Sequence, residues 1–342
     1  MALRHLVKIS LCLTFIVIML GAYTRLADAG LGCPDWPGCY GHYAVPQSDS
    51  ALEVAKARFP QHTIEPEKAW LEMVHRYFAG TLGLLIFLIT IVAVKTPRTN
   101  PVIPLVLCII VIGQALLGMW TVTLKLMPVI VMLHLLGGYT LLVLQAVFYC
   151  QLNAVGNHSF SPSSASPGLM RLFSALVFVV VLVQILLGGW TSSNYAALMC
   201  TSLPICQGDW TEHLSWREAF SFWQTGFDNY EFGVLDYSAR MTIHVSHRFG
   251  AMITAVFVLC YCWLLVKQRL YQIRKTGLWL AAILVCQIVL GVSNVVFHLP
   301  IYVAVAHNLG AAVMFTLVGI SLYYLWQGEA QAIFKAKGVR YE

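Results

Sequence analysis

Gln114-Ala-Leu-Leu-Gly118, followed by His134-Leu-Leu-Gly137, is a stretch that the chain repeats as Gln287-Ile-Val-Leu-Gly291, followed by His307-Asn-Leu-Gly310. In both copies the histidine stands twenty residues after the glutamine. A further match lies upstream of each stretch, where His75-Arg76 corresponds to His247-Arg248. The chain therefore consists of two copies of one unit, and each copy contributes two histidines.

The composition indicates a membrane protein. Of the 342 residues, 59% are hydrophobic and 11% are charged, whereas about a quarter of a soluble domain is charged. Apolar runs near the ~20 residues that span a bilayer occur near 10–25, 72–94, 102–123, 128–150, 172–191, 241–266, 277–298 and 301–326. We interpret the first run as a helix and not as a signal peptide, because no small-residue cleavage site follows it. The pattern predicts an all-α integral membrane protein with eight transmembrane helices.

The distribution of charge predicts the orientation. Lys and Arg are enriched in cytoplasmic segments, and here they gather at the N-terminus and in the short connections, whereas the acids gather in two long loops, 26–71 and 192–240. We therefore expect cytoplasmic N- and C-termini and long loops on the outer side of the membrane. The net charge of +6 then reflects topology, and it does not indicate nucleic-acid binding.

The repeat divides the chain into two halves. Leu20-Gly21 aligns with Leu187-Gly188 at a shift of 167, and the paired cysteines of the two long loops share that shift. Four spans in each copy would keep the copies in one orientation, as two parallel four-helix bundles related by internal duplication. We expect an N-terminal half at 1–152 and a C-terminal half at 170–342. The Ser-, Pro- and Gly-rich segment 153–169 between them is predicted to be a mobile cytoplasmic linker.

Four histidines stand at similar depth near the outer ends of their helices. They are His75, His134, His247 and His307. Polar side chains in the bilayer are costly and usually functional, which favours ligand roles over structural ones. Two imidazoles on neighbouring helices suit the axial positions of a heme, whereas zinc requires three or four protein ligands. The glycines that follow His134 and His307 fit either porphyrin packing or ordinary helix packing.

The two copies differ beside these histidines. Glu72 precedes His75 by three residues, and His244 takes the same place before His247. Residues three apart share a helix face, and a carboxylate beside a metal site can exchange protons. The difference predicts that the first copy carries out chemistry and the second holds a cofactor. The alternative is that Glu72 is only a charge at a helix start, stabilised by the helix dipole.

Arg76 and Arg248 follow the upstream histidine in each copy. A guanidinium near the outer surface suits the carboxylates of heme propionates, so both are candidate cofactor-binding residues. The alternative is that they extend to the membrane interface.

The ten cysteines fall into two groups. Six lie in apolar runs, where cysteine fills space as a small hydrophobe. The other four form Cys33–Cys39 and Cys200–Cys206, with identical spacing in loops assigned to an oxidising compartment. This spacing predicts two local disulfides. The alternative is a redox-active thiol pair.

Taken together, these residues resemble the heme A synthase family, in its cysteine-containing bacterial type. The resemblance covers nearly the whole chain and rests on Gly30-Leu-Gly-Cys33-Pro-Asp-Trp-Pro-Gly-Cys39, Glu72-Met-Val-His75-Arg76, His134, the second cysteine pair, His247-Arg248 and His307. It implies a membrane oxidoreductase that converts heme O to heme A for terminal oxidases, by successive hydroxylation of a porphyrin methyl group to a formyl group.

The resemblance also implies roles for residues and partners. His247 and His307 would ligate a resident heme b, His75 and His134 would hold the substrate heme O, and Glu72 would be needed for turnover. Delivery of heme O by a heme O synthase and assembly into a homo-oligomer are further expectations. The electron acceptor is not identified by any residue.

Two other classes of function fit parts of the sequence. A di-heme b-type electron-transfer protein, such as a quinol-linked cytochrome, needs the same four histidines. It does not account for Glu72 or the cysteine loops, and it would usually place hemes near both membrane faces. A transporter built from parallel repeats would carry charges near the middle of its spans, where this chain has almost none.

Overall fold

The computed structural model describes residues 2–97, 99–154, 167–204 and 206–336. These residues form eight helices long and apolar enough to cross a membrane, and they form no β-strand, which confirms the predicted all-α membrane fold. The eight are α1 (Ala2–Leu26), α3 (Pro66–Lys95), α4 (Val102–Thr123), α5 (Pro128–Ala154), α6 (Pro167–Ser193), α8 (Tyr237–Val266), α9 (Tyr271–Val296) and α10 (Ile301–Ala336). The protein is thus a multi-pass membrane protein.

Several helices begin before the apolar runs that predict them. Helix α1 begins at Ala2 and α3 at Pro66, against the expected starts near 10 and 72. Hydropathy marks only the part of a helix in lipid, and the polar turns beyond it continue the same hydrogen-bond ladder. As a result, Glu72 lies in the second turn of α3, whereas the effect of a helix dipole fades within the first turn.

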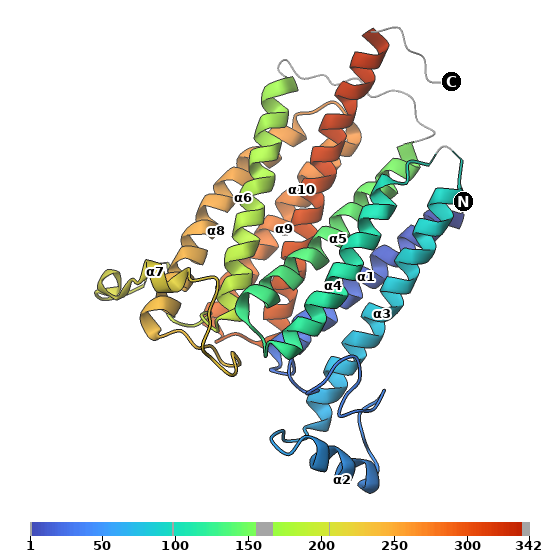
Figure 1. Cartoon of the computed structure of the whole chain (residues 1–342). Coiled ribbons are helices and arrows are strands. Elements are labelled where there is room, and N and C mark those ends of the chain that lie inside the picture. Colours follow the sequence, from blue (N-terminus) through green and yellow to red (C-terminus); the bar gives the residue numbers. More distant parts are fainter. Residues whose placement is uncertain (1, 98, 155–166, 205, 337–342) are drawn as a thin grey trace.

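The helices form two adjoining groups. In the first, α1 packs against α3 and α5, and α4 packs against α3 and α5. In the second, α6 packs against α8 and α10, and α9 packs against α8 and α10. The groups meet where α1 and α5 contact α10 and where α5 contacts α6 (Figure 1). This arrangement is compatible with duplication into two four-helix halves, and the division itself stays a prediction.

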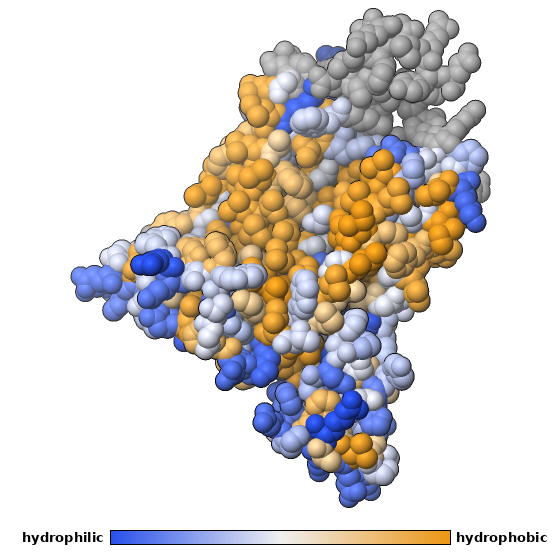
Figure 2. Space-filling model, viewed as in Figure 1, coloured by the Kyte–Doolittle hydropathy of each residue, from blue (hydrophilic) through white to orange (hydrophobic). Residues whose placement is uncertain are grey.

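The long loops lie at one end of the bundle, here called the loop end (Figure 1). The first loop contains α2 (Asp49–Arg58), and the second contains the 3-10 turn η1 (Trp210–His213) and the short helix α7 (Trp216–Ala219). Figure 2 shows polar residues gathered over this end and apolar residues along the helices. The start of α1 lies at the opposite end. Most of the expected linker, 155–166, lies outside the described residues.

Two polar contacts join the groups at positions that the repeat does not share. The hydroxyl of Tyr139 on α5 donates to the main-chain oxygen of Asn308 on α10 at 2.6 Å and lies 2.8 Å from its side-chain oxygen. At the loop end, Arg25 donates to the Tyr195 hydroxyl at 2.7 Å and to the Ser192 carbonyl at 2.8 Å. Buried hydrogen bonds of this kind stabilise one packing arrangement, so they hold the two groups in a fixed relation.

Candidate functional site

The four histidines lie at matching depths near the loop end. His134 and His307 are the seventh residues of α5 and α10, and His75 and His247 lie about one turn deeper in α3 and α8. At 1.5 Å per residue, all four stand roughly 9–15 Å from the start of their helices. The duplicated sequence therefore places equivalent imidazoles at one level in both groups of helices.

His75 and His134 face each other in the first group. Their ring centroids are 6.5 Å apart and the ring planes are nearly perpendicular, at 84°. A metal–imidazole bond is about 2 Å long and the bonded nitrogen lies about 1.1 Å from the ring centre, so two rings on one ion have centroids about 6.3 Å apart. The observed separation fits an iron held between the two rings.

The surroundings of the histidines suit heme iron better than zinc. Among the described residues, no group of three or more His, Cys, Asp or Glu side chains could hold a metal ion. A protein zinc site uses three or four such ligands, whereas a heme needs only two axial ones. The facing pair His75 and His134 therefore fits a bis-histidine heme site, and the repeat predicts the same for His247 and His307.

A glycine on a neighbouring helix faces each histidine. A β-carbon at Gly21 would stand 2.8 Å from Cε1 of His75, and one at Gly188 would stand 3.1 Å from Cε1 of His247. The other two pairs are Gly291 with His307, at 3.3 Å, and Gly118 with His134, at 3.5 Å. Because hydrogen is the only side chain that fits the closest of these contacts, the glycines allow the rings to pack directly on the neighbouring backbone.

The glycines that follow His134 and His307 have a different role. Gly137 lies against the side-chain amide of Gln114, and Gly310 lies against that of Gln287. A β-carbon at either glycine would overlap the amide, so these glycines allow close helix packing. Of the two readings of these glycines, the structure supports helix packing, and it explains why Gln and Gly recur together in both copies.

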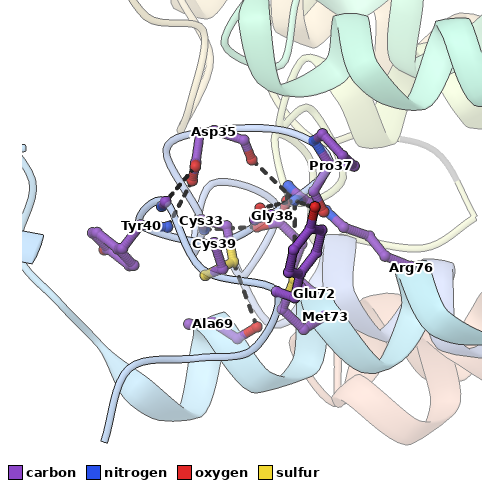
Figure 3. The surroundings of a disulfide bond; sticks show 12 residues. Cys33, Asp35, Pro37, Gly38, Cys39, Tyr40, Ala69, Glu72, Met73 and Arg76 are labelled. Atoms are coloured by element: carbon purple, nitrogen blue, oxygen red, sulfur yellow. Dashed lines mark hydrogen bonds and ion pairs between the residues drawn. A yellow bond between two sulfur atoms is a disulfide. The ribbon is translucent and has the colours of Figure 1, made fainter. Parts of the chain in front are cut away.

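Glu72 faces the first outer loop (Figure 3). It is only 5% exposed, and its Oε2 accepts a hydrogen bond from the main-chain N–H of Cys33 at 2.9 Å. Its other oxygen pairs with Arg76. The counterpart His244 is also buried and donates from Nδ1 to the Ala196 carbonyl at 2.9 Å. Both side chains therefore anchor an outer loop to a helix that carries one of the four histidines.

The two arginines also hold the outer loops. Arg76 donates to the carbonyls of Asp35 at 2.9 Å and Gly38 at 2.5 Å. Arg248 donates to the carbonyls of Cys200 at 2.6 Å and Ser202 at 2.7 Å. Neither sequence alternative, propionate binding or extension to the interface, includes this role. Contact with heme propionates stays a prediction, and it would have to use the guanidinium edges that the carbonyls leave open.

Each cysteine pair closes a loop of the same length. The structure joins Cys33 to Cys39 and Cys200 to Cys206, with Cα–Cα distances of 4.8 Å and 5.6 Å. Within the first loop, the carboxylate of Asp35 accepts from the main-chain N–H groups of Tyr40 at 2.6 Å and Gly41 at 2.8 Å. Sequence analysis did not single out Asp35, although an aspartate ahead of a Gly-containing turn is a known turn signal.

A family model described as cytochrome oxidase assembly protein, COX15-CtaA, matches residues 4–318. A heme A synthase of Shewanella oneidensis is 51% identical over 95% of this chain and 97% of its own length. The chain belongs to the heme A synthase family. More distant relatives include the heme A synthases of Paracoccus denitrificans, 25% identical over 92% of the chain, and Parvibaculum lavamentivorans, 22% identical over 92%.

The glycine–histidine contacts predict a graded series in this family member. Alanine at Gly21 or Gly188 should displace the facing imidazole, at a cost of about 1–3 kcal/mol in unfolding free energy from overpacking, and Gly118→Ala should have the smallest effect. Thermal unfolding of the purified variants measures the loss of stability, and their heme content measures the displacement of the imidazole. Gly80→Ala and Gly113→Ala are matched controls, since nothing lies within 4 Å of a β-carbon at either position. Equal effects of test and control variants would contradict the proposed contact.

The disulfides predict a local response to reduction in this family member. Breaking Cys33–Cys39 should destabilise the first loop by about 2–4 kcal/mol and leave the membrane helices folded. Limited proteolysis should then cut the loop faster in Cys39→Ser than in the parent protein, with unchanged helical circular dichroism. Thiol titration of protein purified without reductant gives the decisive control: free thiols at these four cysteines would show that the pairs are not bonded.

Proposed function

We propose that the protein converts heme O to heme A for terminal oxidase biogenesis, by successive hydroxylation of a porphyrin methyl group to a formyl group. The observation that carries the proposal is the 51% identity to a heme A synthase over 95% of the chain. The facing pair of imidazoles, at the separation expected for one iron between them, supports it independently.

The two sites are assigned different roles. His75, on the same helix as Glu72, and His134 hold the iron of heme O as substrate. His247 and His307 hold a resident heme b. When bound, heme b supplies one-electron transfer. The support for this division is the exchange of a carboxylate for an imidazole, Glu72 against His244, at corresponding positions of the two copies.

The residues of the chain position the substrate and control water. The four histidines would hold the two irons, and Gly21 and Gly188 set the positions of the His75 and His247 rings by direct contact. Glu72 is the only acid buried among the described residues, and a buried carboxylate beside a substrate can take or deliver a proton. The first loop covers this carboxylate through Cys33, which limits access of water.

We assign the loop end to the periplasm and the termini to the cytoplasm of a bacterial inner membrane. Support comes from the charge distribution and from the disulfides in both outer loops, which persist in oxidising compartments. Heme O then reaches the site from the bilayer, delivered by a heme O synthase. Assembly of several copies is part of the same proposal.

Pigment analysis distinguishes this proposal from a di-heme electron carrier. The protein is purified from cells with and without a supply of heme O, and its hemes are extracted and separated. We expect heme A or a hydroxylated intermediate only when heme O is supplied. An electron carrier would retain unmodified heme b under both conditions, and that result would overturn the proposal.

A further inference from the structure

Of the four histidines, only His247 has a side-chain partner on its second ring nitrogen. Nε2 of Gln184, on α6, lies 3.0 Å from Nδ1 of His247 and donates to the main-chain oxygen of the same residue at 3.1 Å. Nδ1 of His75, His134 and His307 is buried without a hydrogen bond of normal geometry. Each of these three has a looser contact with a main-chain group, of Val17, Gln114 and Gln287 respectively.

The glutamine occupies a place that the second copy provides and the first does not. Gly250 lies three residues after His247, and a β-carbon there would overlap Oε1 of Gln184. At the repeat shifts, Gln184 corresponds to Val17, and Gly250 corresponds to Phe78. The two positions thus change together between the copies: glutamine stands with glycine in one, and valine stands with phenylalanine in the other.

The partner of the second nitrogen controls how an imidazole binds a metal. When Nε2 binds iron, the ring proton stays on Nδ1, and an acceptor for that proton fixes the ring plane and strengthens the ligand. Oε1 of Gln184 is buried and has no partner. In the structure the amide nitrogen faces both Nδ1 and the main-chain oxygen of His247. A half turn of the amide brings Oε1 to Nδ1–H instead, and the amide must then tilt away from the main-chain oxygen, because two acceptors cannot share a hydrogen bond. Which amide atom faces the ring is decided by the ring proton.

We propose that Gln184, in the space left by Gly250, is the positioning residue that makes the His247 site a permanent heme site. The inference rests on the proposed assignment of resident heme b to His247 and His307. An oriented, strengthened ligand holds ferric heme tightly and lowers its midpoint potential. His75 has only the looser main-chain contact of Val17 in place of a side-chain partner, so the first site binds its heme less tightly, which suits a site that must accept a substrate and release a product.

Redox titration of bound heme b tests the role of Gln184. The variant Gln184→Leu removes the acceptor, so the preference of the site for ferric over ferrous heme should fall about tenfold, which is an upward shift of about 59 mV in midpoint potential. Gln184→Glu keeps an acceptor and should give a potential at or below that of the parent protein. If the leucine variant loses its heme, the glutamate variant decides alone. A potential above that of the parent protein would then overturn the inference.

The matched control is Gln145→Leu. Gln145 is also a buried glutamine on a membrane helix, and it accepts a hydrogen bond from Thr14 at 3.0 Å, but it contacts none of the histidines in any described hydrogen bond. The control should leave the potential unchanged. Equal potentials in the parent protein, Gln184→Leu and Gln184→Glu would overturn the inference.

The reciprocal change tests the inference at the first site. Val17→Gln with Phe78→Gly should give His75 the partner that it lacks and slow the release of heme from that site about tenfold or more. Unchanged release would count against the inference. The potential measurements also include His75→Ala protein, in which the first site is disabled. If that protein binds no heme b, the assigned resident site is wrong. If it binds heme b and the potential does not depend on Gln184, only the inference is refuted.

Discussion

Alanine at His247 or His307 is expected to abolish the absorption of resident heme b, whereas alanine at His75 or His134 should leave it in place. In the proposed assignment each histidine is one of two ligands of an iron, so loss of either would leave that iron with one protein ligand. The measurement is the reduced-minus-oxidised spectrum and the heme content per chain of protein purified without a heme O supply.

His244→Ala is the matched control for this series. His244 is buried three residues before His247, but its Nδ1 donates to the Ala196 carbonyl, so its loss should disturb the second loop and spare the heme. Loss of heme b from all five variants alike would indicate general unfolding. Loss from the His75 and His134 variants alone would reverse the assignment of the two sites.

Removal of the Glu72 carboxylate has the second large expected effect. Glu72→Ala should retain resident heme b and bind heme O, and it should lower the rate of product formation by about 10²–10⁴-fold, the usual contribution of a positioned proton-transfer group. Single-turnover conversion of bound heme O, followed by extraction, measures this. The same change leaves Arg76 without its ion-pair partner and the Cys33 amide without its acceptor, so it also loosens the first loop.

Glu72→Gln separates the two consequences. The amide oxygen can still accept from Cys33, but the side chain can no longer exchange a proton at neutral pH. If the Glu72→Gln variant is as inactive as the Glu72→Ala variant while its first loop still resists proteolysis, Glu72 takes part in the chemistry. Near-normal activity of the glutamine variant would show that Glu72 only anchors the loop, and the catalytic role would be withdrawn.

The sequence alone predicts the all-α membrane fold and the eight spans, because periodic apolar runs of bilayer length have one structural solution. It also predicts the spacing-matched disulfides. It misplaces helix starts such as Pro66, since helices extend beyond lipid where hydropathy no longer marks them. That error matters for function, because the earlier start argues against the alternative that Glu72 is only a charge at a helix start, and the structure shows it as a buried anchor of the first loop.

The contacts between helices could not be predicted from the sequence. Gly21 against His75, or Gln184 against His247, depends on helix rotation and separation, which periodicity does not specify for helices that are apolar on most faces. Arg76 and Arg248 illustrate the same limit. Their position beside the histidines suggests propionate binding, whereas the structure shows their guanidiniums bonded to loop carbonyls. The internal repeat is the signal that could have indicated Gln184, since it differs from Val17.

The most direct test of the central claim is the conversion of heme O by the purified protein. Heme O is added to the parent protein and to Glu72→Gln in lipid with an electron acceptor, and the porphyrins are identified by mass spectrometry over time. We predict that the hydroxylated intermediate and then heme A form in the parent protein, and that heme O persists in the variant. Heme O that remains unmodified in the parent protein, with both heme sites occupied, would contradict the account.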